Sequence, residues 1–168
     1  KFFKEVTNMD FLAVLDYEHL DNGVFLTSFA KSLANKQNRG LIIHGDSEHT
    51  ERIIQTGVMR EEAQIRAIKE LNHRLVALFA DEGVSTIALN GFQKSLITYD
   101  GSTIEIDKKQ IDRLPEHPMI LISNLALDPT SEKYRPIQLT NMATALSATF
   151  EIDEVTLFSI DDSSDFIK

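Results

Sequence analysis

Cysteine and tryptophan are absent from this sequence of 168 residues. Without cysteine the chain can form neither a disulfide nor a thiolate metal site, and it suits a reducing compartment. Long apolar runs are absent too, whereas a membrane-spanning helix needs about 20 consecutive apolar residues. The first residues, KFFKEVTNMDF, carry charges where a secretory signal needs an apolar segment. We therefore expect a cytoplasmic globular protein without a membrane segment.

Positive charge is scarce, since 17 Lys and Arg residues stand against 26 Asp and Glu residues. The formal net charge is −9, and the basic residues are scattered along the sequence. Such a chain repels nucleic acid and anionic membrane surfaces, because both are bound through clustered positive charge. We therefore expect neither of them as a partner.

Short apolar segments alternate with longer helical patterns, which is typical of βαβ units and a mainly parallel sheet. The expected strands are residues 11–17, 41–45, 85–89, 118–127 and 155–160. The expected helices are residues 24–34, 61–81, 108–114 and 140–150, with a short one that is capped by Asp46 or Ser47 and runs through Ile54. Residues 95–107 predict a hairpin that turns at Asp100-Gly101. We expect one α/β domain over residues 1–168, a three-layer αβα sandwich.

Polar residues and glycines follow the expected strands, in residues 16–19, 44–47, 90–91 and 123–124. In open α/β sheets, ligands bind beyond these carboxyl ends of the strands. The segment His44-Gly45-Asp46-Ser47 separates a strand from a helix, which is a position that favours anions. It has a single glycine, however, and Asp46 places a negative charge where a phosphate would lie. These residues favour a capped turn over a phosphate loop.

Two longer segments carry a family resemblance. Residues 72–97, NHRLVALFADEGVSTIALNGFQKSLI, are similar to V-N-K-x-L-V-A-L-x-x-x-x-G-V-x-A-x-G-L-S-G-x-D-x-x-L-I of the amino-acid kinase superfamily. Residues 134–161 resemble its Y-N-I-N-A-D-x-x-A-x-x-x-A-x-x-L-x-A-x-K-L-I-L-L-T-D. The resemblance implies an acetylglutamate-kinase-like fold and the lobe that binds the amino-acid substrate. It also implies a homodimer and, for an active member, ATP and Mg²⁺ as cofactors.

The residues with which that family handles phosphate are mostly replaced. By the resemblance, Asp16 stands in place of the lysine that stabilises the transferring phosphoryl group. Gly45 is the one glycine kept of three in the second phosphate loop, and Thr140 replaces an organising aspartate. Phosphoryl transfer rests on stabilising negative charge, so an acid in place of that lysine opposes it. The sequence also ends soon after residue 160, so we expect the family's nucleotide-binding lobe to be absent.

These replacements predict a catalytically inactive or regulatory protein that binds a small amino-acid-like metabolite or acts through dimerisation. No catalytic residue, cofactor or metal is assigned. We expect the ligand at the polar strand ends and the start of the last helix, with Arg60 as the remnant of the family's substrate arginine: His44, Gly45, Asp46, Ser47, Arg60, Asn90, Gly91, Gln138 and Asn141. The alternative is an acetylglutamate-kinase-type phosphotransferase that uses ATP and Mg²⁺ and lacks its ATP lobe here.

Two further hypotheses arise from acids and histidines near the first two strand ends. Asp16 and Glu18 alternate on one strand and could form a carboxylate pair for hydrolysis. His19, His44 and His49 lie near several carboxylates and could bind a divalent cation. No compact ligand motif supports the cation, and strand-end acids are usually solvated. Both hypotheses therefore rank below the metabolite site.

Overall fold

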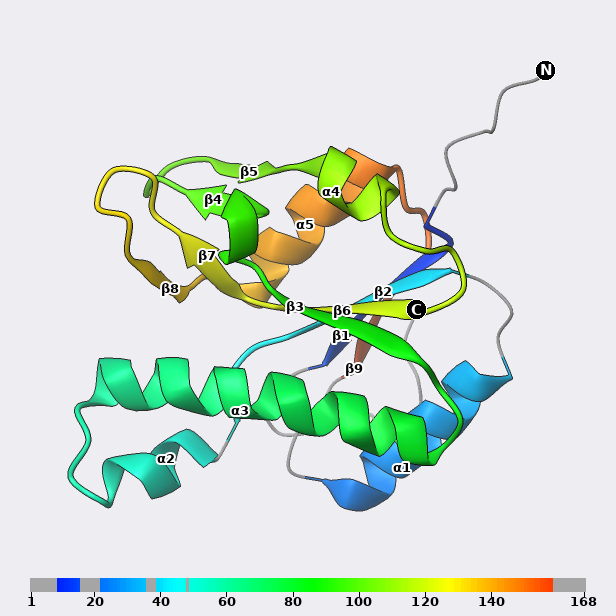
Figure 1. The fold of residues 1–168 in the computed structure, drawn as a ribbon, viewed down its shortest axis with the longest axis horizontal. Coiled ribbons are helices and arrows are strands. Elements are labelled where there is room, and N and C mark those ends of the chain that lie inside the picture. The colour runs from blue at the N-terminus through cyan, green and yellow to red at the C-terminus, as the bar shows by residue number, and fades with distance from the viewer. Residues whose placement is uncertain (1–8, 16–21, 36–38, 48, 159–168) are drawn as a thin grey trace.

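A five-stranded parallel sheet forms the centre of the molecule (Figure 1), in the order β3-β6-β2-β1-β9. The computed structural model describes residues 9–15, 22–35, 39–47 and 49–158. Parallel sheets are covered on both faces, and the fully buried strands β1, β2 and β6 accordingly have nearly continuous apolar sequences. The strands are β1 (Phe11–Leu15), β2 (Gly40–His44), β3 (Thr86–Asn90), β6 (Met119–Ser123) and β9 (Val155–Phe158).

Helices lie on both faces of this sheet, as Figure 1 shows. On one face lie α1 (Gly23–Ala34) and α3 (Arg60–Asp81), and the short α2 (His49–Ile54) packs against α3. On the other face lie α5 (Leu139–Phe150) and the short α4 (Lys108–Asp112). The expected αβα sandwich with a mainly parallel sheet is therefore confirmed. The predicted helices begin and end within two residues of these bounds.

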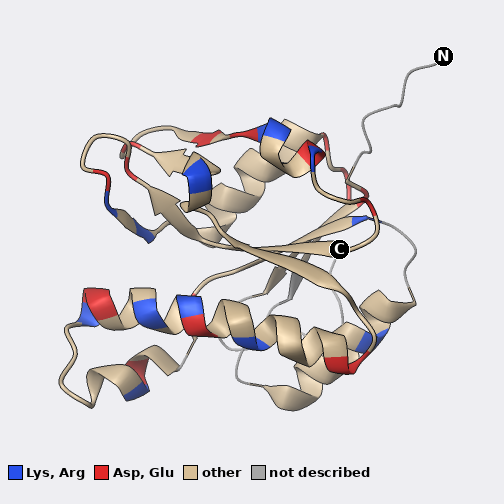
Figure 2. Cartoon of the chain, viewed as in Figure 1, with Lys and Arg blue, Asp and Glu red and all other residues tan. Residues whose placement is uncertain are grey.

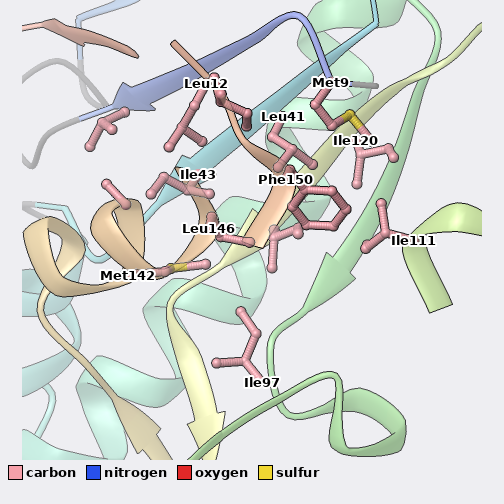
Figure 3. Close-up of a cluster of buried hydrophobic side chains, with 14 of the residues drawn as sticks. Met9, Leu12, Leu41, Ile43, Ile97, Ile111, Ile120, Met142, Leu146 and Phe150 are labelled. Carbon is pink, nitrogen blue, oxygen red and sulfur yellow. The ribbon is translucent and has the colours of Figure 1, made fainter. Parts of the chain in front are cut away.

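The side chains of each strand alternate between two buried clusters, because successive residues of a strand point to opposite faces. Leu12 and Val14 of β1 belong to the cluster that contains Leu146 of α5, which Figure 3 shows. Phe11 and Ala13 belong to the cluster on the opposite face, together with aromatic side chains of α1 and α3. Burial on both faces fixes the register of the central strands, because a slip of one residue would exchange the two clusters.

A second, four-stranded sheet lies on the α5 side of the molecule, in the order β5-β4-β7-β8. The antiparallel pair β4–β5 is the hairpin that the sequence predicts, and Asp100 Oδ1 accepts hydrogen bonds from the backbone of Ser102 and Thr103 at its turn. The short β8 was not predicted. The strands are β4 (Ile97–Tyr99), β5 (Ile104–Ile106), β7 (Leu125–Leu127) and β8 (Tyr134–Pro136).

The single strand expected over residues 118–127 is wrong, because the chain changes sheets at Asn124. Residues before Asn124 form β6 in the parallel sheet, and residues after it form β7 in the second sheet. The backbone N–H of Asn124 donates to the carbonyl of His44, at 2.9 Å, and its own carbonyl accepts from Ile137 N, at 2.9 Å. Asn124 is therefore bonded to β2 on one side and to the segment before α5 on the other.

Gly40 begins β2 because the ring of Phe11 occupies the space that a side chain would need. The two residues are register partners in neighbouring strands, and a Cβ on Gly40 would overlap the buried Phe11 ring. We expect Gly40→Ala to lower the free energy of unfolding by about 1–3 kcal/mol, the usual cost of overpacking a core. Urea unfolding followed by circular dichroism measures this change.

The matched control is Gly23→Ala at the start of α1, where an added Cβ meets nothing within 4 Å. This substitution should change stability by no more than about 0.5 kcal/mol. An equal loss of stability in both variants would contradict the packing role of Gly40.

Candidate functional site

A cavity of about 590 Å³ opens at the carboxyl ends of β2 and β6. We call it the strand-end cavity. Its lining comes from the loop after β2, from α3, from the β6–β7 junction and from the segment between β8 and α5. These residues are Gly45, Asp46, Gln64, Asn124, Pro136, Ile137, Gln138, Leu139 and Thr140. The cavity lies at the edge of the sheet where α/β folds bind their ligands.

Asn124 connects two walls of this cavity. Its Nδ2 donates to the carbonyl oxygen of Ile137 at 2.6 Å, and a Cβ on Gly45 would lie 3.0 Å from the same nitrogen. A side chain at position 45 would therefore press on the Asn124 amide, which would have to move by a few tenths of an ångström. The Oδ1 atom of Asn124 is buried and has no hydrogen-bond partner among the described residues. A buried acceptor without a partner is uncommon in folded proteins.

Asp46 gives the strand-end cavity its charge. It is the one ionisable residue among the described residues that line the cavity. Its Oδ2 accepts a hydrogen bond from Gln64 Nε2 at 3.1 Å, which joins the loop after β2 to α3. Figure 2 shows both basic and acidic residues along α3, but none of those basic residues lines this cavity. The one formal charge among the described lining residues is therefore negative.

His44 is fully buried next to this cavity and does not line it. The carbonyl of Gly45 can only accept, so Nδ1 of His44 carries the proton and donates to it, at 3.0 Å. Nε2 then accepts from Asn72 Nδ2, at 3.0 Å, and the same amide nitrogen donates to the carbonyl of Leu89 at 3.3 Å. Burial lowers the pKa of His44 from 6.5 to about 4, so the ring is neutral at pH 7. Both ring nitrogens are engaged, and the bond from Asn72 to Nε2 joins β2 to α3.

Ser47 and Gly91 have backbone roles in the structure. Ser47 is fully buried, and its Oγ accepts from the backbone N–H of His49, at 3.2 Å, at the start of α2. A Cβ on Gly91 would lie 2.6 Å from the carbonyl oxygen of Leu125, so the loop after β3 needs glycine to pass the β6–β7 junction. The structure therefore places neither residue among those that line the strand-end cavity.

The start of α5 contributes the residues expected there. Gln138 and Thr140 line the cavity, and Asn141 Nδ2 donates to Gln138 Oε1 at 3.0 Å. Arg60, at the start of α3, lies away from the lining: its side chain is 68% exposed and pairs with Glu51 at 3.1 Å. Of the nine expected ligand residues, the structure brings together Gly45, Asp46 and Gln138, with Asn141 bonded to the last.

Asn90 lies at a second cavity, of about 660 Å³, between α3 and the edge strand β3. Its Oδ1 accepts from Ser123 Oγ at 2.7 Å. Beside it, Lys69 Nζ donates to the hydroxyl of Tyr134, and the rings of Phe92 and Tyr134 stack with centroids 3.9 Å apart. We call this the edge-strand cavity: Lys69, Asn72, His73, Val76, Ala77, Ala80, Ala88, Asn90, Phe92 and Gln93 line it.

Residues 16–19 lie outside the described residues, so the carboxylate pair Asp16–Glu18 stays a hypothesis. For the cation hypothesis, no three His, Asp or Glu side chains in the described ranges are grouped to hold a metal. His49 Nε2 instead contacts Glu70 Oε2 at 2.6 Å. None of the helices in the described part of the chain has the length and hydropathy that crossing a membrane requires.

The lining residues that were not predicted from the sequence lie in elements whose local sequence does not indicate a site. Gln64 is one of several polar residues in the first turns of a long amphipathic helix, and nothing in its spacing sets it apart. Pro136 ends the unpredicted strand β8, and Ile137 and Leu139 follow it. Asn124 is one of the strand-end positions noted from the sequence. Its role at the β6–β7 junction could not be predicted, because the division of residues 118–127 between two sheets was not predicted.

The fold resembles two solved kinase structures. An isopentenyl phosphate kinase matches with a TM-score of 0.67 and 16% identity, over 89% of this chain and 72% of that chain. Aspartate kinase from Synechocystis matches with a TM-score of 0.68 and 8% identity, over 89% of this chain and 28% of that chain. No protein-family model and no curated protein matches the sequence significantly.

Both matched proteins belong to the amino-acid-kinase superfamily, so the chain has the amino-acid-kinase fold. This confirms the fold that the motif resemblance implied. At such low identity the likeness concerns the fold alone. The activity depends on the site, whose residues differ from those of the family motifs.

The burial of neutral His44 predicts a stability that depends on pH. Its pKa in the folded state, about 4, lies below its unfolded value of 6.5. The unfolded chain therefore binds a proton that the folded chain excludes, and stability falls as the pH drops from 6.5 towards 4. His44 alone should remove up to about 3 kcal/mol of the free energy of unfolding over this range.

Urea unfolding at a series of pH values between 4 and 7 measures this loss. His44→Gln removes the titrating group and should flatten the profile. His73→Gln, at an exposed histidine of α3, is the control and should keep the original slope. An unchanged slope in His44→Gln would show that His44 does not titrate as its burial requires.

Proposed function

We propose that this chain binds a small amino-acid-like metabolite in the strand-end cavity and transfers no phosphate itself. The observation that carries the proposal is the charge of the lining, in which Asp46 is the one ionisable residue among the described residues. A kinase site surrounds its phosphates with lysine, arginine, metal ions and backbone N–H groups. An acidic lining repels the phosphoryl group that such a reaction transfers.

The replacements in the sequence support the same proposal. Thr140, which lines the cavity, stands where the family motif has its organising aspartate. Gly45 is the one glycine kept from the second phosphate loop, and Asp46 follows it. Aspartate at position 16 stands where that family has its lysine. All of these positions differ from the family motif. This favours a protein that has lost phosphoryl transfer and has kept a binding site.

The size and lining of the cavity suit a small metabolite. Ligand pockets commonly measure about 300–1,000 Å³ and combine apolar walls with a few placed polar groups. Ile137 and Leu139 supply apolar surface, whereas Gln64, Gln138 and Thr140 supply hydrogen-bonding groups. An amino acid or a compound of similar size fits this combination.

The kinase fold itself supports a second candidate function. An ATP-dependent phosphotransferase acting on a small acyl amino acid would need cations that the described lining does not contain. A partner, or another part of the protein, would have to supply them together with ATP and Mg²⁺. The homodimer implied by the motif resemblance also stays a prediction, which sedimentation equilibrium tests.

Thermal unfolding in the presence of candidate ligands distinguishes the two functions. We expect at least one compound among the common amino acids and their N-acetyl derivatives to raise the melting temperature, and ATP with Mg²⁺ to have no effect. A ligand at 100 times its dissociation constant adds about 2.7 kcal/mol to stability. For a chain of this size that corresponds to a rise of about 5–10 °C.

Filling the cavity provides the matched control. Thr140→Trp places an indole in the lining and should abolish the shift, whereas Thr144→Trp, one turn further along α5 and outside the lining, should keep it. Stabilisation by ATP with Mg²⁺, or release of ADP with any compound of the panel, would support the phosphotransferase instead. No shift with any amino acid or derivative would contradict the binding function.

A further inference from the structure

The edge-strand cavity shares no lining residue with the strand-end cavity. One part of its lining is apolar and consists mainly of small side chains: Val76, Ala77, Ala80, Ala88 and Phe92. The other part is polar: Lys69, Asn72, His73, Asn90 and Gln93. No aspartate or glutamate of the described ranges belongs to this lining, although the sequence has 26 acidic residues. The permanent charge at this cavity is therefore positive, in a protein whose net charge is −9.

Lys69 supplies this positive charge, and neutral groups hold it in place. Its Nζ donates to the hydroxyl of Tyr134 and lies 4.5 Å from the centre of the Tyr134 ring and 5.4 Å from that of Phe92. No carboxylate of the described residues forms an ion pair with it. An ammonium group has three donor hydrogens, so the bond to Tyr134 leaves further donors for a ligand.

The amides of Asn90 and Gln93 add two more donors. The backbone N–H of Asn90 can only donate, so it is Gln93 Oε1 that faces it, at 2.5 Å. Asn90 Oδ1 accepts from Ser123 Oγ, at 2.7 Å. The described hydrogen bonds thus engage the oxygen of each amide and leave both amide nitrogens without a partner.

The other polar groups of the lining do not offset these donors. Asn72 Nδ2 donates to His44 and to the carbonyl of Leu89, so Asn72 Oδ1 is the one amide oxygen of the lining without a described partner. In its neutral form, His73 offers one donor and one acceptor. Each residue on the open edge of β3 likewise adds one N–H and one C=O. An ammonium and two amide nitrogens therefore stand against one amide oxygen, which favours an anionic ligand.

We propose that the edge-strand cavity is a second binding site, which takes a small carboxylate with a short apolar chain. Lys69 supplies the opposite charge, and the amide nitrogens of Asn90 and Gln93 donate to the carboxylate oxygens. The two oxygens of a carboxylate accept several hydrogen bonds at once, and bonds to a charged group are the stronger ones. This inference goes beyond the proposed function, which concerns the other cavity.

The apolar part of the lining selects the remainder of the ligand. Val76, Ala77, Ala80 and Ala88 can cover a hydrocarbon chain but offer no side-chain hydrogen bond. The volume of about 660 Å³ lies within the usual range of ligand pockets. Inorganic phosphate fits less well, because it has no apolar part and brings more negative charge than one lysine balances.

The test uses probes that share a chain length and differ in charge. Hexanoate, 1-hexanol and hexylamine have the same six-carbon chain and are respectively anionic, neutral and cationic at pH 7. Isothermal titration calorimetry should give hexanoate at least about tenfold tighter binding than either of the others or inorganic phosphate. The net charge of −9 attracts the amine, so a preference for hexanoate must come from the site.

Lys69→Met removes the charge but keeps an unbranched side chain, and it should weaken hexanoate binding at least about tenfold. Lys109→Met is the matched control, because it removes the same charge at an exposed position of α4, on the other face of the sheet. It should leave the affinity within about twofold, since distant exposed charges are screened by salt. Thermal unfolding followed by circular dichroism checks that both variants are folded.

Ala77→Trp fills the cavity from an exposed position of α3, so it tests the site without disturbing the core. It should abolish hexanoate binding, whereas Thr144→Trp, outside both cavities, should retain it. Thr140→Trp closes the strand-end cavity and should also retain it.

Three results would overturn this second site: no binding of hexanoate, equal binding of hexanol or phosphate, or an unchanged affinity in Lys69→Met. Loss of hexanoate binding in Thr140→Trp would do so too, because it would place the probe in the strand-end cavity. The proposed function stands or falls separately, with the amino-acid panel.

Discussion

Asn124 holds the two sheets together at the point where the chain passes from one to the other. Its backbone bonds to His44 in the parallel sheet and to Ile137 before α5, and its side chain bonds to Ile137 again. These bonds set the distance between the carboxyl end of β2 and the start of α5. Since those two segments both line the strand-end cavity, the shape of the cavity depends on this asparagine. The hydrogen bond that Asn72 of α3 donates to His44 ties α3, which also lines the cavity, to β2.

Most of the fold could be predicted from the sequence because its central strands are buried on both faces. Continuous apolar segments such as FLAVL and MILIS have no other stable place than the middle of a covered parallel sheet. The split of residues 118–127 could not be predicted, because Leu125 and Ala126 are as apolar and as buried as the residues of β6. The apolar pattern predicts that these residues are buried, but it does not predict to which of the two sheets they belong. The three residues of β8 include a proline and carry too short a pattern to indicate a strand.

The site could be located from the sequence only in part. Gly45 and Asp46, which the strand-end rule indicated, line the strand-end cavity, as does Gln138, which the family motif indicated. Asn90, which the same rule indicated, lies instead at the edge-strand cavity, because β3 is an edge strand. His44 and Ser47 follow the same rule in sequence, but their polar atoms are buried in bonds to the protein. A polar residue at a strand end can therefore hold the walls of a site rather than face its ligand, and only the hydrogen-bond partners distinguish the two.

Tyr134, which stacks on Phe92, is an intrinsic spectroscopic probe of the molecule. With no tryptophan and three tyrosines in the chain, the intrinsic fluorescence comes from tyrosine alone. The Tyr134 ring has an unusual environment, since Phe92 stacks on it and the ammonium of Lys69 lies 4.5 Å from its centre. Tyr134 is also two residues from Pro136, which lines the strand-end cavity. Tyrosine fluorescence and near-ultraviolet circular dichroism of the unlabelled protein are therefore the signals with which to follow binding in that cavity.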